Sequence, residues 1–301
     1  MHYRYYTCDV FTREPFSGNP LAVFPDASGI PDAAMQKIAR ELNLSETVFV
    51  LPPESDAHDV RVRIFTPGRE MDFAGHPTLG TAWVLCHLGL HALNEGRSTL
   101  VLGENVGPVP VTLRVKDGEL ESAELSVAQL PQFEPAPDAE ALAAITGLAA
   151  ADFAGGAYAP RFASCGAKFL MAVLNSTEAL GRVQIQGGGY AELLRSAPSQ
   201  DLWLAASVGE GRWQARMFAP LMGIPEDPAT GSAAAAFGGF LAEAEPLAAG
   251  TQRWQIDQGI EMGRPSQLFV ELDRAEHQTR AVRVRGAAVM ISDGQMRVAG
   301  A

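Results

Sequence analysis

The feature that most constrains this chain is an internal repeat of short motifs. Residues 63–67 (RIFTP) share the order Arg, apolar, Phe, small, Pro with residues 216–220 (RMFAP). Residues 76–82 (HPTLGTA) match residues 227–233 (DPATGSA) at their proline, glycine, hydroxyl and alanine positions. Both pairs occur in the same order and at a nearly constant offset along the chain. Such self-similarity indicates that one structural unit occurs twice.

A third match and the chain length support two units. Residues 103–107 (GENVG) are echoed by residues 259–263 (GIEMG). At 301 residues, the chain is longer than a single hydrophobic core usually grows. The proline-rich, acidic stretch at residues 130–140 (LPQFEPAPDAE) is typical of a linker. We therefore predict an N-terminal half at residues 1–125 and a C-terminal half at residues 126–281. The strands expected within residues 282–301 could complete either half.

Hydrophobic periodicity predicts the elements of the first half. A helix is expected over residues 31–42 because Pro31 suits a first helical turn and apolar residues recur on one face. Strands are expected over residues 45–51 and 60–65. Residues 77–88 are apolar all round, which is typical of a buried helix, and the following glycine is a helix stop.

The second half repeats this order. A strand is expected over residues 213–218 and a buried, alanine-rich helix over residues 228–242. Each half is therefore expected to be a mixed unit with a central helix. If the halves pack about a pseudo-twofold axis, both helix N-termini would point into one cleft between them.

Composition excludes several classes of partner and indicates a location. The net charge of −12 and a pI of about 5.0, with no Lys/Arg cluster, argue against nucleic acid. No apolar stretch approaches the ~18 residues that a membrane helix needs. The first residues lack the pattern of a signal peptide. Cys8, Cys86 and Cys165 are widely spaced and form no CxxC, which argues against a disulfide framework and suits a cytoplasmic protein.

The repeated turns are the first candidates for chemistry. Each predicted central helix has proline at its first position, preceded by a polar residue that can cap it, His76 or Asp227. Helix N-termini bind anions through free N–H groups, so a substrate carboxylate is expected there. The alternative is two well-capped helices without a ligand. The N–H groups expected to face the anion are those of Gly80, Thr81, Gly231 and Ser232.

Glu46 is a candidate acid or base. It lies in residues 43–50 (NLSETVFV), where a helix gives way to an apolar strand. Burial there would raise the pKa of its carboxyl group, although an exposed, inert glutamate is the alternative. A metal site is not expected, because Gly89 interrupts the only close histidine pair, His87 and His91, and no third ligand is near.

Taken together, these motifs resemble the PhzF family, the phenazine-biosynthesis proteins and their relatives. The matching segments span nearly the whole chain, and EDPATGSA after RMFAP is the most specific of them. They are residues 17–24 (SGNPLAVF), 43–50, 73–82 (FAGHPTLGTA), 216–233 (RMFAPLMGIPEDPATGSA) and 262–271 (MGRPSQLFVE). The resemblance implies an α+β, diaminopimelate epimerase-like fold of two pseudo-symmetric halves, each a sheet wrapped around a central helix. It also implies a homodimer without a cofactor.

The resemblance further implies an isomerase that moves a proton between carbons of a small carboxylate, as in the conversion of trans-2,3-dihydro-3-hydroxyanthranilate. By motif position the catalytic residues would be Glu46, His76 and Asp227. The substrate-binding residues would be Asn19, Gly75, Gly80, Thr81, Thr230, Gly231 and Ser232. Related racemases use two cysteines, and Ala74 and Pro228 occupy those places here. A non-catalytic metabolite-binding protein and an epimerase using Glu46 and Asp227 remain alternatives.

Overall fold

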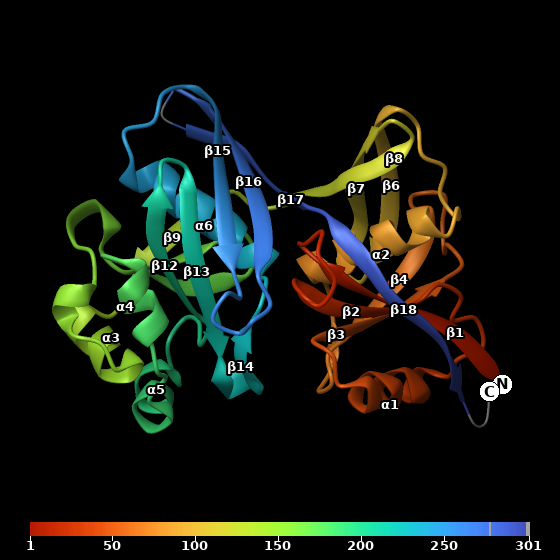
Figure 1. Cartoon of the computed structure of the whole chain (residues 1–301), viewed down its shortest axis with the longest axis horizontal. Helices are drawn as coiled ribbons and strands as arrows, with labels where there is room; N and C mark the ends of the chain where they lie inside the picture. The colour runs from red at the N-terminus through yellow and green to blue at the C-terminus, as the bar shows by residue number, and fades with distance from the viewer. Residues whose placement is uncertain (277, 299–301) are drawn as a thin grey trace. The chain divides into compact units, whose positions relative to one another are not determined.

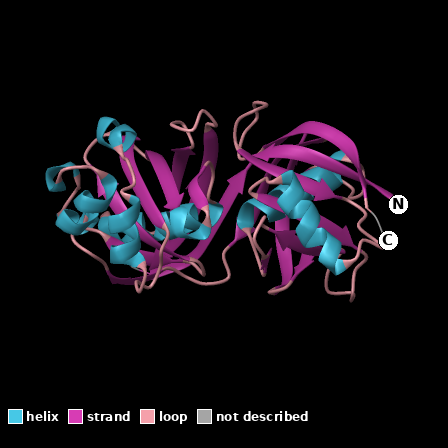
Figure 2. Ribbon diagram, turned by 90° about the horizontal axis from the view of Figure 1, so that it is seen from below, coloured by secondary structure: helices cyan, strands magenta, loops and turns pink. Residues whose placement is uncertain are grey.

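We describe residues 1–276 and 278–298 of the chain in a computed structural model (Figure 1). The chain divides into two compact units. Unit 1 comprises Met1–Leu125 and Arg285–Ala301, and unit 2 comprises Ser126–Val284. Each unit contains both helices and strands (Figure 2). Within the described part of the chain, no helix is both long and apolar enough to cross a bilayer.

Unit 1 is a curved sheet built from both ends of the chain. Its strands are β1 (His2–Val10), β2 (Asn19–Phe24), β3 (Glu46–Leu51), β4 (Val60–Phe65), β5 (Glu70–Met71), β6 (Gly96–Glu104), β7 (Gly107–Lys116), β8 (Glu119–Ser126) and β18 (Ala288–Arg297). β1 pairs antiparallel with both β2 and β18, with His2 opposite Arg297. The first and last strands therefore lie side by side (Figure 1). The C-terminal strand β18 belongs to unit 1.

The central helix of unit 1 is α2 (Gly75–His87), which contacts β1, β2, β3, β7 and β18. Nearly all its residues are buried, as expected for a helix that is apolar all round. Gly80 lets α2 approach the sheet closely, because a Cβ atom there would lie 2.5 Å from Leu21 Cδ2 and 2.7 Å from Val10 Cγ2. The helix α1 (Asp32–Leu42) packs Met35, Ile38 and Ala39 in a second cluster with Phe24 and Phe49.

Unit 2 repeats this plan with additional helices. Its strands are β9 (Gln132–Pro135), β10 (Arg161–Ser164), β11 (Lys168–Leu174), β12 (Leu202–Gly209), β13 (Arg212–Ala219), β14 (Ile224–Asp227), β15 (Gly250–Gln258), β16 (Ser266–Ala275) and β17 (Gln278–Gly286). The central helix α6 (Gly231–Ala244) contacts β10, β11 and β16. A separate hydrophobic cluster joins β11, β12 and β13 to α3 (Ala139–Thr146), α4 (Thr177–Arg182) and α5 (Gly187–Leu194).

An arginine–glutamate pair occurs at the equivalent place in each unit. Arg63 of β4 donates from Nε and Nη2 to the two carboxylate oxygens of Glu70, both at 2.8 Å. Arg216 of β13 makes the same two bonds to Glu226, also at 2.8 Å. Two parallel, charge-assisted bonds of this kind fix orientation as well as adding energy. The repeated arginine of the sequence motifs therefore anchors the short strand that leads to each central helix.

The structure corrects three expected boundaries. α2 begins at Gly75, so Pro77 is its third residue and not its first. α6 begins at Gly231, so Pro228 precedes the helix. Part of the expected linker at residues 130–140 forms β9, which pairs antiparallel with β10, and the rest leads into α3. β9 has only four residues and three of them are exposed, so its composition is as polar as that of a linker.

Candidate active site

Glu46 and His76 lie in contact inside unit 1. Oε2 of Glu46 is 3.2 Å from Nε2 of His76, and their side chains are only 13% and 6% exposed. Glu46 is the first residue of β3, and its β-sheet partner on β2 is Leu21, whose side chain faces α2. His76 is the second residue of α2. Sheet register and the helix start therefore bring together two residues that are thirty positions apart in sequence.

The environment of His76 favours a neutral imidazole. Burial lowers its pKa from 6.5 to about 3, and a hydrogen bond to the backbone of Pro20 opposes this shift only in part. Proline has no N–H, so its backbone can only accept, and the imidazole must donate. Because Nε2 faces Glu46, the donor to Pro20 is Nδ1. The neutral ring then presents the Nε2 lone pair to Oε2 of Glu46.

The remaining candidates of unit 1 have different positions. Asn19 is fully buried at the start of β2, next to Pro20. Gly75 is the first residue of α2, so its N–H has no partner within the helix. Gly80 and Thr81 lie well inside the helix, where the backbone N–H groups serve intrahelical bonds, so the expectation that they face an anion is wrong.

The capping roles expected for His76 and Asp227 are also wrong. The residue before α2 is Ala74, which provides no side-chain cap, and His76 is already helical. Asp227 ends β14, three residues before Thr230 caps α6 without a side-chain bond. The helix starts were predicted wrongly because proline is common at a first helical position. Here Pro77 is the third residue of its helix and Pro228 precedes its helix.

In unit 2, Asp227 and Thr230 form a compact turn. The Thr230 hydroxyl donates to Oδ2 of Asp227. Gln258, fully buried at the end of β15, accepts from Thr230 N–H at 2.9 Å and donates to the Asp227 carbonyl at 2.7 Å. Gly231 and Ser232 follow as the first two residues of α6, whose N–H groups have no acceptor within the helix.

Sequence reasoning missed Gln258 and its counterpart in unit 1, Glu104. Each is the last residue of the strand after the central helix, and each bonds to that helix's first turn or the turn before it. Glu104 is 5% exposed and contacts Thr78. One signal in the sequence could have found them. Glu104 lies within the repeated turn GENVG, and Gln258 immediately precedes its counterpart GIEMG.

The three cysteines do not resemble catalytic thiols. Burial raises the pKa of Cys86 to about 11 and that of Cys165 to about 12, and it raises the pKa of Cys8 further. A thiolate is the reactive form of cysteine, so these environments oppose nucleophilic or base chemistry. Among the described residues, no cluster of three or more His, Cys, Asp or Glu side chains is arranged to hold a metal ion.

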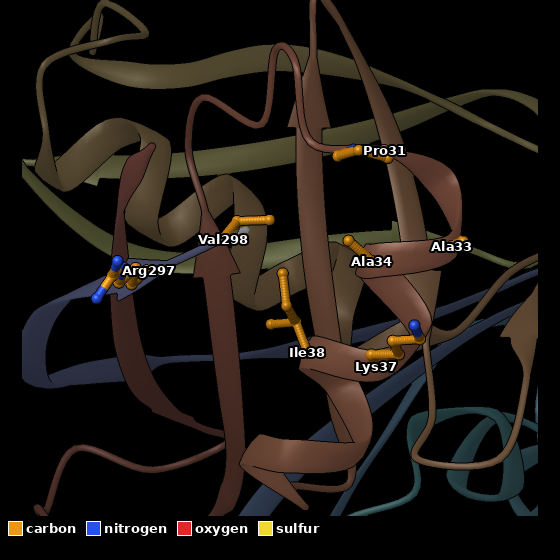
Figure 3. Close-up of a pocket in the computed structure, with 7 residues that line it drawn as sticks. All are labelled: Pro31, Ala33, Ala34, Lys37, Ile38, Arg297 and Val298. Atoms are coloured by element: carbon orange, nitrogen blue, oxygen red, sulfur yellow. The ribbon is translucent and has the colours of Figure 1, made fainter. Parts of the chain in front are cut away.

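A surface cavity of about 380 Å³ lies elsewhere in unit 1. Its lining comes from α1, the proline before it and the residues at the end of β18, and it includes two basic side chains, Lys37 and Arg297 (Figure 3). None of the candidate site residues lines it. The cavity is therefore separate from the Glu46–His76 pair.

Comparison with known proteins points to one family. A family model described as phenazine biosynthesis-like protein, PhzC-PhzF, matches residues 8–294. An uncharacterized isomerase from Mesorhizobium japonicum is 40% identical over 97% of this chain and 98% of that protein. The trans-2,3-dihydro-3-hydroxyanthranilate isomerase of Pseudomonas aeruginosa is 36% identical over 98% of this chain and 99% of its own length.

Solved structures give the same result for the fold. A PhzF-family protein from Bacillus anthracis aligns with a TM-score of 0.88 and 27% identity, covering 99% of this chain and all of that one. A hydroxyproline epimerase from Agrobacterium vitis aligns with a TM-score of 0.62 at 13% identity, over 98% and 92% of the two chains. The expected α+β, epimerase-like fold is confirmed.

Proposed function

Because this chain belongs to the PhzC-PhzF family and is an isomerase, we propose that it moves a proton between carbons of a small carboxylate substrate, with Glu46 as the acid and base. The chemistry would resemble that of its relative that isomerises trans-2,3-dihydro-3-hydroxyanthranilate.

The observation that carries the proposal is the 3.2 Å contact between Glu46 and His76. A group that protonates one carbon and deprotonates another must exchange its proton easily within an enclosed site. The neutral His76 ring lies against the Glu46 carboxyl group with its Nε2 lone pair toward Oε2, so it can accept a hydrogen bond when Glu46 carries the proton. His76 thereby orients the carboxyl group when Glu46 is protonated.

Substrate binding is assigned to groups at the two helix starts. The N–H groups of Gly75 in unit 1, and of Gly231 and Ser232 in unit 2, suit a carboxylate because helix N-termini favour negative charge. Asn19 and Thr230 provide further polar groups, and Asp227 is a second candidate for proton transfer.

A glutamine variant tests the role of Glu46. Glu46→Gln retains size and polarity but cannot accept a proton, so it should fold, bind substrate and lose on the order of a hundredfold or more in rate. Turnover of trans-2,3-dihydro-3-hydroxyanthranilate in heavy water, followed by NMR, reports both the rate and the position of deuterium. Glu41→Gln, the same change at an exposed position of α1, is the matched control. Near wild-type turnover by Glu46→Gln would overturn the assignment.

The same experiment separates the alternatives. An epimerase that uses Glu46 and Asp227 would invert a stereocentre without moving a double bond, which the NMR spectrum of the product distinguishes. A protein that only binds metabolites would bind the compound without incorporating deuterium. A two-cysteine racemase is disfavoured, because burial holds the pKa of all three thiols above its usual value.

The proposal extends to assembly and location. By analogy with the family, the protein would be a cytoplasmic homodimer that needs no cofactor. Light scattering of the purified protein over a concentration series tests the dimer. A mass equal to one chain of 32.0 kDa at all concentrations would contradict it.

A further inference from the structure

A second buried carboxyl group lies against the helix turn that carries His76. Oγ1 of Thr78 lies 2.6 Å from Oε1 of Glu104 and 2.7 Å from the carbonyl oxygen of Ala74. Thr78 is fully buried and Glu104 is 5% exposed. Ala74 immediately precedes α2, so the three groups connect the end of β6 to the first turn of α2.

Counting hydrogens assigns the protonation of this chain of groups. Two contacts this short each require a hydrogen, yet the Thr78 hydroxyl provides only one. The Ala74 carbonyl can only accept, so it takes the hydroxyl hydrogen of Thr78. The other contact is then satisfied when Glu104 is an un-ionised acid that donates its own hydrogen to Thr78 Oγ1.

The surroundings of Glu104 agree with the acid form. Burial raises the pKa of Glu104 from 4.5 to about 8, and the effects of Thr78 and of the nearby Arg61 guanidinium lower it only in part. Arg61, on β4, is itself engaged by the Gly103 carbonyl, by Asn105 and by Glu54. The ring of His58 packs against the face of β6 at Gly103. Successive residues of a strand face opposite sides, so the Glu104 side chain lies on the other face from His58.

Unit 2 has an uncharged group at the matching place. Gln258 ends β15 as Glu104 ends β6, and its amide braces the turn before α6 through Thr230 and Asp227. An amide always has both a donor and an acceptor, whereas a carboxyl group has a donor only when protonated. The Gln258 amide in unit 2 can therefore donate a hydrogen bond at any pH, whereas Glu104 can donate one only in its acid form.

We propose that Glu104 is a positioning residue for the Glu46–His76 pair: through Thr78 its acid form holds the Ala74 carbonyl and thus the turn from which His76 projects. The inference rests on the proposed function, because it assumes that the pair is catalytic. When Glu104 ionises, the Thr78 hydroxyl must turn to the carboxylate, and the Ala74 carbonyl keeps only its longer bond of 3.2 Å from the Thr78 N–H. The start of α2 then loses a bond two residues before His76.

The pH profile of a glutamine variant tests this role. Wild-type kcat should fall above pH 8 as Glu104 loses its proton, and it should level off about tenfold lower, the same loss that is expected when the Thr78 hydroxyl is removed. Glu104→Gln copies the amide of unit 2, so it should keep kcat within about threefold at pH 7 and should not show this fall. A variant whose alkaline limb coincides with that of the wild type would overturn the proposal.

Two changes at Thr78 separate positioning from simple packing. Thr78→Val keeps the shape but removes the hydroxyl group, and it should lower kcat about tenfold with little change in KM. Thr78→Ser restores the hydroxyl group and should recover most of that loss. Equal activity of the valine and serine variants would contradict the relay even if both fold normally.

Infrared spectroscopy provides a readout that does not depend on turnover. The wild type at pH 6.5 should show the carbonyl band of a buried carboxylic acid that disappears near pH 8 and is missing from Glu104→Gln. Absence of that band would overturn the inference. The result is independent of Glu46: if Glu46→Gln is active, the proposed function fails, whereas the state of Glu104 and its effect on the alkaline limb are still measured directly.

Discussion

Arg216 and Glu226 are joined by two parallel hydrogen bonds of 2.8 Å, and Glu226 is the residue immediately before Asp227. The Arg216 side chain is also held by the carbonyls of Leu180 and Val183. This pair therefore sets the position of the second turn of the duplicated motif, just as Arg63 and Glu70 do in unit 1.

Breaking this pair should destabilise the protein. Arg216→Met leaves the Glu226 carboxylate buried without its partner, which costs about 3–5 kcal/mol of unfolding free energy. Urea denaturation measures the change. The control is Arg182→Met, which removes a more exposed ion pair with Asp152 and should cost much less. Equal effects of the two changes would show that the Arg216 pair is not structurally important.

The buried neutral His76 should make the protein less stable in acid. Its pKa is about 3 in the folded protein and 6.5 in the unfolded chain, so the unfolded chain binds more protons between these values. The stability that neutral His76 contributes at neutral pH is therefore lost as the pH falls below 6.5. Relative to His76→Gln, the wild type should lose about 1 kcal/mol per pH unit between pH 6 and 4. Parallel stability curves for the two proteins would contradict a neutral, buried His76.

Glu104 should affect stability in the opposite direction. Its pKa is raised to about 8 in the folded protein, so the folded form retains a proton that the unfolded chain releases near pH 4.5. The stability that Glu104 contributes is complete below pH 4.5 and is lost as the pH rises toward 8. Glu104→Gln should therefore melt close to the wild type at pH 4.5 but at a higher temperature at pH 8. Calorimetry at both pH values tests this, and an unchanged difference in Tm would contradict it.

Two glycines of α2 should respond differently to alanine. A Cβ at Gly80 would lie 2.5 Å from Leu21, so Gly80→Ala should destabilise the protein by about 1–3 kcal/mol through overpacking. A Cβ at Gly75 meets nothing within 4 Å, so Gly75→Ala should leave stability nearly unchanged. If Gly75 binds the substrate carboxylate, its variant should instead raise KM. If instead Gly80→Ala raises KM and Gly75→Ala lowers stability, Gly80 would face the substrate anion, as the sequence suggested.

Removal of metal should not affect turnover. In the proposed mechanism Glu46 transfers the proton and helix N–H groups hold the charge, which requires no metal ion. We expect full activity after exhaustive dialysis against a chelator, measured beside an undialysed sample and one supplemented with divalent cations. Loss of activity on dialysis, restored by one metal, would contradict the proposed mechanism.

The duplicated motifs predicted the fold well because they are local and strongly periodic. The strand at residues 60–65 was predicted at its observed bounds, and both buried helices were found, although the first residue of each was wrong. The starts were wrong because proline is tolerated at several positions near a helix N-terminus. The strand β9 was missed because its residues alternate only weakly between buried and exposed.

The site was less accessible to sequence reasoning. Glu46 and His76 were chosen as single residues, and only the register of β3 against β2 showed that they touch. Glu104 and Gln258 were missed because the end of a strand carries no periodic signal. Their importance depends on contacts with Thr78 and Thr230, which lie far away in sequence.

The pairing of β1 with β18 also has a consequence for biosynthesis. The ribosome completes all of unit 2 before β18 emerges, so unit 1 has to wait for a strand made almost three hundred residues after its neighbour. Domains generally fold as units while the chain is being made. Unit 2 can therefore mature during translation, whereas the sheet that carries Glu46 closes only when synthesis is nearly finished. A nascent chain arrested before residue 288 should contain a protease-resistant unit 2 and no isomerase activity.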